Sequence, residues 1–138
     1  MEAKKAFAND EIPVGAIIVR DGRVVAKSCN ENRAMKNPIL HAEILAIVDA
    51  SKKLNNERLT DCEIFVTKEP CAMCAGAIIH ARIKRVVIAT EDIKYGACGS
   101  VLTICGNKNL NHIPVIEFGL LRDEAATLLK KFFQKKRI

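Results

Sequence analysis

Three residues that commonly bind zinc and one carboxylate stand in two short groups of the sequence. The first group is His41-Ala42-Glu43, and the second is Pro70-Cys71-Ala72-Met73-Cys74. One imidazole and two thiolates give a tetrahedral zinc ion three protein ligands and leave its fourth position to water, as in catalytic zinc sites. Because zinc lowers the pKa of that water towards neutrality, the resulting nucleophile can attack a polarised ring carbon. We therefore predict that His41, Cys71 and Cys74 bind one Zn²⁺.

The spacing of these residues predicts that they lie at the beginnings of two helices. Cys71 and Cys74 are three positions apart, so their thiols share one face in the first turn of the helix that Pro70 opens. The helix N-terminus and the cation both stabilise a thiolate there. His41 and Glu43 do not share a helix face, so we expect zinc to sit over the start of the first helix. Glu43 then acts as general acid and base, which takes a proton from water and protonates the ring nitrogen and the departing amine.

The spaced motif H-x-E with P-C-x-x-C is the established signature of zinc-dependent nucleobase deaminases. A C-x-x-C pair can also be redox-active or form half of a structural zinc site, with Cys98 and Cys105 as further ligands. These two cysteines stand seven residues apart, which fits such a site poorly, so the H-x-E triplet favours catalytic zinc. His80 is interpreted as structural, whereas His112 has both a structural and a phosphate-binding interpretation. Buried free cysteine is common, so we interpret four cysteines as packing residues: Cys29, Cys62, Cys98 and Cys105.

The segments around these motifs predict alternating strands and helices. Residues 15–20 and 23–26 are typical of two strands joined by a tight Asp21-Gly22 hairpin. The next expected elements are a helix over 42–50, a strand over 62–67, a helix over 71–81, a strand over 85–89 and a short strand over 114–117. The last helix is amphipathic, and its apolar stripe consists of Leu121, Ala125, Leu128 and Phe132. This order predicts an α/β fold in which a mixed sheet lies between helices.

Composition and charge restrict the class of protein. A chain of 138 residues that is 49% hydrophobic and 28% charged predicts one globular domain over residues 1–138. No stretch approaches the roughly 18 consecutive apolar residues of a membrane span, and the first residues lack the apolar core of a signal peptide. We therefore expect a cytoplasmic protein without a membrane partner. The net charge of +6 favours a polyanionic partner such as nucleic acid, although solvated lysines also produce such a charge.

Several further segments carry a resemblance to a known family. They are residues 11–16, Asn30, residues 69–77, 80–82 and 92–100, Asn111-His112 and Phe132-Phe133. With them, the sequence from Asn9 to Arg137 resembles the bacterial tRNA-specific adenosine deaminases of the cytidine deaminase-like superfamily. The zinc motif belongs to the whole superfamily, whereas residues 92–100 and the basic, aromatic last helix resemble the tRNA enzymes in particular. The resemblance implies a three-layer α/β/α sandwich with a central mixed five-stranded sheet.

The resemblance also implies an activity and a set of contacts. The activity is hydrolytic deamination of the wobble adenosine of an arginine tRNA to inosine. The enzyme would be a homodimer with one Zn²⁺ per subunit, whose subunits together hold the anticodon stem-loop. The resemblance implies that Asn30 forms a hydrogen bond with the flipped base and that Val14 and Ala42 line the pocket of this base. The residues implied to contact the RNA loop are Asp92, Lys94, Phe132, Phe133 and the terminal Lys and Arg residues. The residue pattern alone also permits Val14 and Phe132 to be core residues.

Two segments depart from the family pattern. Residues 2–8 form a shortened version of the usual first helix, and Asn37-Pro38-Ile39-Leu40 stands where the family has Asp-Pro and small residues. We expect Ile39 and Leu40 to reshape the rim of the site. Two other functions stay open from the sequence: deamination of a small free base or nucleoside, and RNA binding by a zinc-stabilised subunit without activity. The intact Glu43 argues against an inactive subunit.

Overall fold

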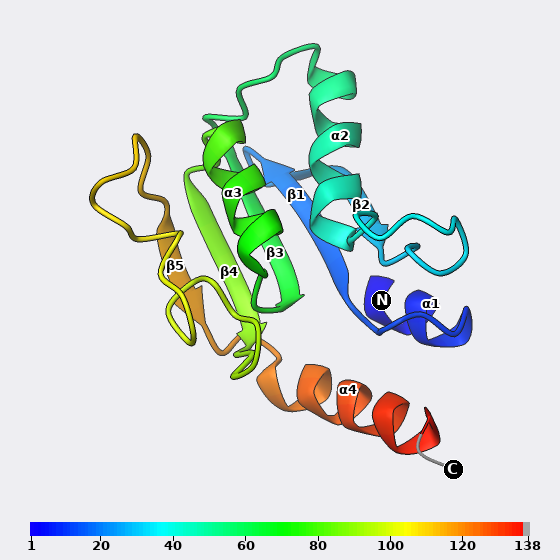
Figure 1. The fold of residues 1–138 in the computed structure, drawn as a ribbon. Coiled ribbons are helices and arrows are strands. Elements are labelled where there is room, and N and C mark those ends of the chain that lie inside the picture. The colour runs from blue at the N-terminus through cyan, green and yellow to red at the C-terminus, as the bar shows by residue number, and fades with distance from the viewer. Residues whose placement is uncertain (137–138) are drawn as a thin grey trace.

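A five-stranded sheet forms the centre of the computed structural model, which describes residues 1–136 (Figure 1). In chain order the elements are α1 (Glu2–Ala8), β1 (Gly15–Arg20), β2 (Arg23–Cys29), α2 (Ala42–Leu54), β3 (Cys62–Lys68), α3 (Ala72–Ala81), β4 (Arg85–Thr90), β5 (Val115–Phe118) and α4 (Arg122–Lys136). The strand order is β2-β1-β3-β4-β5. β1 pairs antiparallel with both β2 and β3, whereas β3, β4 and β5 are parallel, so the sheet is mixed.

The predicted hairpin at Asp21-Gly22 is present between β1 and β2. Arg20 pairs with Arg23, and both central residues have positive φ, 51° for Asp21 and 75° for Gly22. Positive φ at both positions is what a two-residue type I′ turn requires, and its twist matches that of the flanking strands. The sequence signal therefore fixes where β2 returns beside β1.

The main core lies between the sheet and the helices α2 and α3. Because successive strand side chains point to opposite faces, every second residue of β1, β3 and β4 faces these helices. Alanines on the helices let them approach the sheet closely. The buried side chains of this layer include Ile18, Ile64, Val86 and Ile88 from the strands and Ala42, Ala46, Ala50, Ala75 and Ile78 from the helices.

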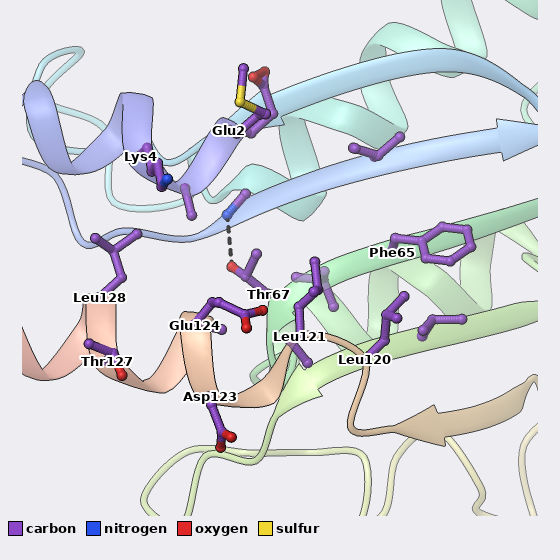
Figure 2. A pocket seen from close by; sticks show the side chains of 18 of the residues that line it. Glu2, Lys4, Phe65, Thr67, Leu120, Leu121, Asp123, Glu124, Thr127 and Leu128 are labelled. Atoms are coloured by element: carbon purple, nitrogen blue, oxygen red, sulfur yellow. Dashed lines mark hydrogen bonds between the residues drawn. The ribbon is translucent and has the colours of Figure 1, made fainter.

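The other face of the sheet is partly covered by α1 and α4, which contact each other through Phe7 and Phe132. The two ring centroids are 6.1 Å apart in an edge-to-face arrangement. Between these helices and the sheet runs a groove of about 740 Å³, lined by apolar side chains such as Phe65, Leu120 and Leu128 (Figure 2). Helices on both faces confirm the predicted α/β/α arrangement with a mixed five-stranded sheet.

The boundaries of several predicted elements need correction. The largest difference in a strand is in β2, which continues beyond Ala26 to Cys29. α4 begins at Arg122, and Leu121 precedes it with φ of 58° and is 66% exposed, so Leu121 does not belong to the buried stripe. The left-handed backbone of Leu121 ends the preceding turn, and its exposed side chain lines the groove beside α4. Helix α2 continues beyond Ala50 to Leu54, and Cys71 caps α3 instead of lying in its first turn. Among the helices described, none combines the length and apolar character that a membrane-spanning segment needs.

Candidate metal centre

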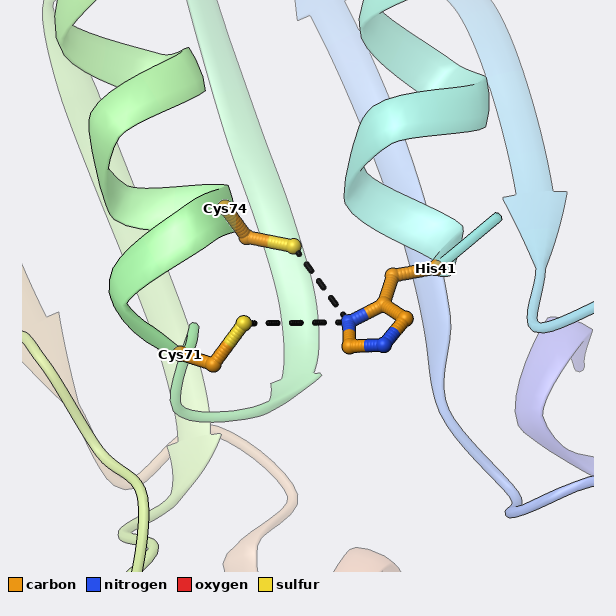
Figure 3. Close-up of side chains that lie close together, drawn as sticks. All are labelled: His41, Cys71 and Cys74. Carbon is orange, nitrogen blue, oxygen red and sulfur yellow. Dashed lines mark hydrogen bonds between the residues drawn. The ribbon is translucent and has the colours of Figure 1, made fainter. Parts of the chain in front are cut away.

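The structure brings the three predicted metal ligands together. The ligand atoms of His41, Cys71 and Cys74 all lie within 4.8 Å of one another. The Nδ1 atom of His41 is 3.7 Å from the sulfur of Cys71 and 3.6 Å from the sulfur of Cys74 (Figure 3). One imidazole nitrogen and two sulfurs at this separation are a donor set that suits tetrahedral zinc.

The topology of the sheet explains why these residues meet. β2 and β3 both run antiparallel to β1, so the two strands point in the same direction and end at the same edge of the sheet. His41 is the N-cap of α2, which follows β2, and Cys71 is the N-cap of α3, which follows β3. Both helices lie on one face of the sheet, so their N-termini converge (Figure 1). The N-termini of both helices favour negative charge at this point.

Hydrogen bonds within the group shift the pKa values of the two thiols in opposite directions. The hydrogen bond from Cys74 is the main cause that lowers the pKa of Cys71 to about 4, and His41 also lowers it. Donation to Cys71, together with burial, raises the pKa of Cys74. The hydrogen bond with Cys71 raises the pKa of His41. One thiolate therefore forms readily, and a divalent cation would displace the remaining protons on binding.

The carboxylate of Glu43 lies buried beside this group. Its residue is 3% exposed, and burial raises the pKa of the carboxyl. The Oε1 atom is buried and has no hydrogen-bond partner among residues 1–136. Buried polar atoms in folded proteins nearly always have a partner, so an orphan at this place indicates room for a polar ligand such as water. The donor set of His41, Cys71 and Cys74 fits a metal ion such as zinc, and the oxygen of Glu43 lies beside it.

Asn30, which begins the loop of residues 30–40, connects this loop to helix α2 through its side chain. Its side chain is buried, and its Oδ1 atom accepts a hydrogen bond of 2.8 Å from the amide nitrogen of Ala42. The backbone amide of Asn30 donates a hydrogen bond to the backbone carbonyl oxygen of Val14. Among the described residues, the Nδ2 atom of Asn30 makes no hydrogen bond, and the contact of Asn30 with a substrate base stays a prediction. Val14 and Ala42 are buried in the core, and their contact with a base stays a prediction.

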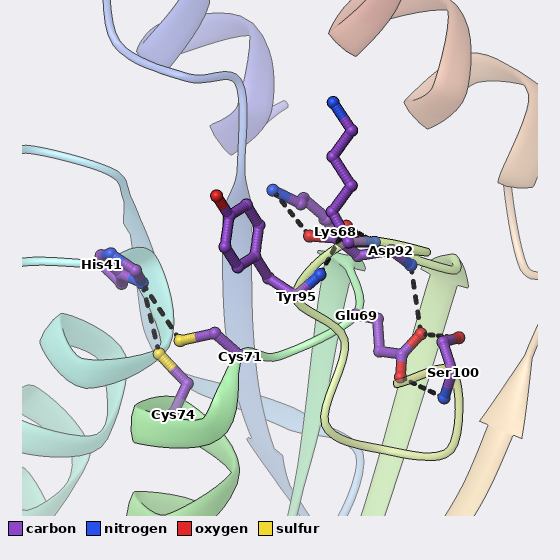
Figure 4. Close-up of polar contacts among 9 residues, drawn as sticks. His41, Lys68, Glu69, Cys71, Cys74, Asp92, Tyr95 and Ser100 are labelled. Atoms are coloured by element: carbon purple, nitrogen blue, oxygen red, sulfur yellow. Dashed lines mark hydrogen bonds and ion pairs between the residues drawn. The ribbon is translucent and has the colours of Figure 1, made fainter. Parts of the chain in front are cut away.

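Residues 92–100, which we term the rim loop, are held by a carboxylate that the sequence analysis gave no role. Glu69 is buried, and its Oε1 atom accepts hydrogen bonds from the amide of Asp92 and the hydroxyl of Ser100 (Figure 4). Its Oε2 atom accepts from the amides of Cys98, at 2.9 Å, and of Ser100, at 3.1 Å. The sequence signal that could have indicated this role is the position of Glu69, an acidic residue between a buried strand and the Pro-Cys start of a helix.

A second buried carboxylate holds the loop that precedes His41. Glu11 accepts hydrogen bonds from the amides of Arg33, at 3.1 Å, and Ala34, at 2.7 Å. The loop of residues 30–40 thus has its own anchor, which sequence reasoning also missed. Ile39 is exposed on this loop, so its side chain is free to form part of the rim. Each of the two loops beside the metal group is therefore held by hydrogen bonds to one buried carboxylate, that of Glu11 or that of Glu69.

Two further residues predicted to contact the substrate, Asp92 and Lys94, differ in whether their side chains already have partners within the protein. Asp92 pairs with Lys68 of β3 at 3.1 Å and accepts hydrogen bonds from the amides of Lys94 and Tyr95, so its carboxylate already has partners within the protein. Although burial opposes it, these hydrogen bonds and Lys68 lower the pKa of Asp92. The side chain of Lys94 is exposed.

The two phenylalanines of α4 differ in burial. Phe132 is 4% exposed and packs against Phe7, so it lies in the core of this chain, and its contact with an RNA loop stays a prediction. Phe133 is 41% exposed. Arg137, predicted with the terminal basic residues, lies outside the described residues.

The remaining cysteines and histidines lie outside the metal group. Among the described residues, the potential ligand group includes neither Cys98 nor Cys105, both of which are buried in the core. The ring Nε2 of His112 lies 2.6 Å from the carbonyl oxygen of Ile83, which favours its structural interpretation. His80 is exposed near the end of α3. The group therefore resembles a catalytic site with three ligands more than a closed structural site with four.

Comparison with known sequences agrees with this geometry. The family model of MafB19-like deaminases matches residues 1–137. The chain is 44% identical over 136 residues to the tRNA-specific adenosine deaminase of Aquifex aeolicus, and the match covers 99% of this chain and 89% of that protein. The tRNA-specific adenosine deaminase of Haemophilus influenzae is 43% identical over 136 residues, which cover 98% of this chain and 79% of that protein.

Two solved structures share the fold. One, from a study of A-to-I editing by tRNA:A34 deaminases at the wobble position of transfer RNA, has a TM-score of 0.90 and 41% identity and covers 93% of each chain. The other, a guanine deaminase from Nitrosomonas europaea, has a TM-score of 0.82 and 27% identity and covers 94% of this chain and 78% of that one. From the identity along nearly its whole length, the chain belongs to the tRNA-specific adenosine deaminase family of the cytidine deaminase-like superfamily.

Proposed function

We propose that this protein hydrolyses the wobble adenosine of a tRNA anticodon to inosine and that arginine tRNA is its substrate. One observation carries the chemistry: a buried carboxylate, Glu43, has an unpaired oxygen beside the ligand atoms of His41, Cys71 and Cys74. A carboxylate next to a three-ligand zinc group is the arrangement that hydrolytic deamination of a ring amine needs. The choice of tRNA rests on the similarity to the tRNA enzymes.

The residues of this chain can carry out each proton transfer of the reaction. His41, Cys71 and Cys74 would hold Zn²⁺, which when bound lowers the pKa of water and so supplies a nucleophile near neutral pH. Glu43 accepts a proton from the attacking water and transfers it to N1 of the adenine ring. The oxygen forms a bond to C6, and Glu43, free again after protonating N1, accepts the remaining proton of the new C6 hydroxyl and passes it to the amine. The C6–N6 bond then breaks, ammonia leaves, and the C6 carbonyl of inosine forms.

Binding of the base rests on residues that already lie beside the metal group. The free Nδ2 donor of Asn30 suits an acceptor on a flipped base, and the Oδ1 atom of Asn30 is held by Ala42. The flipped base would enter between the loop of residues 30–40 and the rim loop. A single-stranded anticodon loop presents splayed bases that such a pocket can take. The net charge of +6 favours association with its phosphates.

Deamination of a free base such as guanine is the second candidate. A guanine deaminase shares the fold at 27% identity, whereas the structure from the tRNA:A34 study shares 41%. The higher identity supports the tRNA substrate. By the same likeness we propose that the enzyme acts as a homodimer with one Zn²⁺ per subunit, and a tRNA substrate implies that it works in the cytoplasm.

The test is inosine formation at the wobble position of an arginine-tRNA anticodon stem-loop by zinc-loaded protein. A Glu43→Ala variant serves as the control, with its zinc content measured in parallel. Inosine that forms only with intact Glu43 supports both the chemistry and the substrate class. If zinc-loaded wild-type protein leaves the stem-loop unchanged but releases ammonia from guanine or a free nucleoside, the second candidate replaces the first.

A further inference from the structure

The rim loop carries an aromatic ring that the protein leaves in water. Tyr95 is 70% exposed, and it is the single tyrosine of a sequence that has no tryptophan. Figure 4 shows the ring of Tyr95 extending from the rim loop towards the side on which His41 and Cys71 lie. The burial of an aromatic side chain is strongly favourable, so an exposed ring beside a binding site indicates a contact made with a ligand.

The backbone on both sides of Tyr95 is fixed. Its amide nitrogen donates to Oδ1 of Asp92 at 3.2 Å, and Asp92 is itself paired with Lys68. The next residue, Gly96, donates to the carbonyl oxygen of Asp92 at 2.9 Å. A Cβ atom at Gly96 would lie 2.4 Å from the carboxyl carbon of Glu69, so the loop can pass this close only with glycine. The ring of Tyr95 therefore projects from a rigid support.

The support lies directly against the metal group. The amide of Ala97 donates to the carbonyl oxygen of Pro70 at 2.8 Å, and Pro70 precedes the ligand Cys71. Three residues of the loop bond to Glu69, which precedes Pro70. A nucleotide joined to a base at the metal group must pass one of the two loops beside it, and the rim loop is one of them.

We propose that Tyr95 is the stacking platform for a base next to the target adenosine, so that it selects a single-stranded nucleic acid over a free base. This inference rests on the proposed function, because it assumes that the target base is part of an RNA loop. Aromatic rings on a fixed support bind splayed bases by stacking, without a requirement for sequence. The exposed Lys94 beside the ring adds a positive charge close to the phosphates.

Another protein chain is the alternative occupant, because Ile93 on the same loop is 84% exposed. The position of the ring beside the metal group favours the nucleic acid. Ile93 also provides a matched control, since Ile93→Ala removes an exposed apolar side chain from the same loop without removing a ring.

The experiment compares Tyr95→Ala, Tyr95→Phe and Ile93→Ala as zinc-loaded proteins on the anticodon stem-loop. We expect Tyr95→Ala to raise KM by about 5- to 150-fold, the loss of one stacked base, with a smaller change in kcat and unchanged zinc content. Tyr95→Phe and Ile93→Ala should stay within about twofold of wild type, because the first keeps the ring and the second never stacks. In a Glu43→Ala background, 2-aminopurine beside the target should be quenched on binding, and Tyr95→Ala should remove this quenching.

Three outcomes would overturn the inference, and they are distinguishable. If wild type forms inosine and Tyr95→Ala has the same KM and the same quenching, the proposed function stands and the stacking role is wrong. If Tyr95→Ala changes the oligomeric state and leaves KM unchanged, the ring belongs to a protein interface. If zinc-loaded wild type neither binds nor edits the stem-loop, the proposed function fails, and the inference fails with it.

Discussion

The buried oxygen of Glu43 that lacks a partner among residues 1–136 is a local cost in the folded protein, which the proposed proton transfer would explain. A carboxylate buried beside cysteines without a full set of partners is destabilising, because burial removes it from water. Glutamine has nearly the same shape and no charge. A position selected for stability alone would therefore favour the amide, whereas the proposed proton transfer requires the carboxylate.

Replacement of Glu43 by glutamine should separate activity from stability. We expect Glu43→Gln to lower kcat by about 10²- to 10⁴-fold, since the amide can neither accept nor return the proton. Zinc content and the melting temperature should not fall, because the ligands are intact and a buried charge is removed. Inosine assays, metal analysis and thermal denaturation measure the three quantities. Glu57→Gln, at an exposed position, is the control, and a Glu43→Gln variant with wild-type kcat would contradict the proposed role.

The buried cysteines offer a second contrast at the residue scale. Cys74 and Cys62 are both buried, yet only Cys74 lies among the ligand atoms. We expect Cys74→Ser to lose most of the bound zinc, because a serine hydroxyl is not deprotonated as a thiol ligand is. Cys62→Ser should keep one zinc ion per chain and lose only some packing energy. Zinc measured per chain by atomic absorption checks this, and an equal loss from both variants would contradict the ligand assignment.

At the scale of elements, the site consists of two helix starts and two loops that buried carboxylates anchor. Glu69 holds the rim loop and Glu11 holds the loop of residues 30–40. Hydrogen bonds to a charged acceptor contribute about 1.5–3 kcal/mol each, so one carboxylate can keep a loop of this size ordered. The order of the loops in turn sets the positions of Tyr95 and Asn30.

Amide variants of the two anchors should loosen different loops. In Glu69→Gln one acceptor oxygen becomes an NH₂ group that faces backbone donors, so we expect faster hydrogen exchange at the amides of Cys98 and Ser100 and a higher KM. In Glu11→Gln we expect faster exchange at Arg33 and Ala34 instead. Each variant is the control of the other. Exchange that accelerates equally in both loops would indicate general destabilisation and contradict the separate anchoring.

The sequence predicted those features that depend on residues adjacent in the chain, and it did not predict the anchoring contacts between residues far apart in the chain. The Asp21-Gly22 turn, the strands and the starts of α2 and α3 follow from adjacent residues, and the strand order then brings His41 to Cys71. The anchoring by Glu69 joins residues 23 to 31 positions apart, and no local pattern indicates such a partner. Leu121 has helical spacing to Ala125, but its left-handed backbone ends the stripe.

Helix α4 depends on one of its two adjacent phenylalanines. Phe132 is buried against Phe7, whereas Phe133 is 41% exposed. We expect Phe132→Ala to lower the free energy of unfolding by about 3–5 kcal/mol, the usual loss for a buried phenylalanine. Phe133→Ala should lower it by less than about 1 kcal/mol. Urea denaturation measures both, and equal losses would show that α4 does not dock through Phe132.

At the scale of the whole molecule, the core, the candidate metal site and the apolar groove lie at different places on the sheet. The face under α2 and α3 holds most of the core, and the edge where these helices begin holds the metal group and both anchored loops. The other face has α1, α4 and the apolar groove (Figure 2). Because the ligands come from two separate helices, a metal ion would join them and stabilise the whole fold.

Removal of zinc should therefore lower the melting temperature of the entire protein. A ligand that binds only the folded state stabilises it by about 2.7 kcal/mol when its free concentration is 100 times Kd. For a chain of this length we expect a decrease on the order of 10 °C on chelation, measured by calorimetry. Cys74→Ser supplies the control, because without the site chelation should leave its melting temperature unchanged. The ligands also stand at the starts of α2 and α3, so amide exchange should accelerate there before it does in α4. A wild-type melting temperature that is the same with and without chelator would show that the three side chains do not hold a metal in the folded protein.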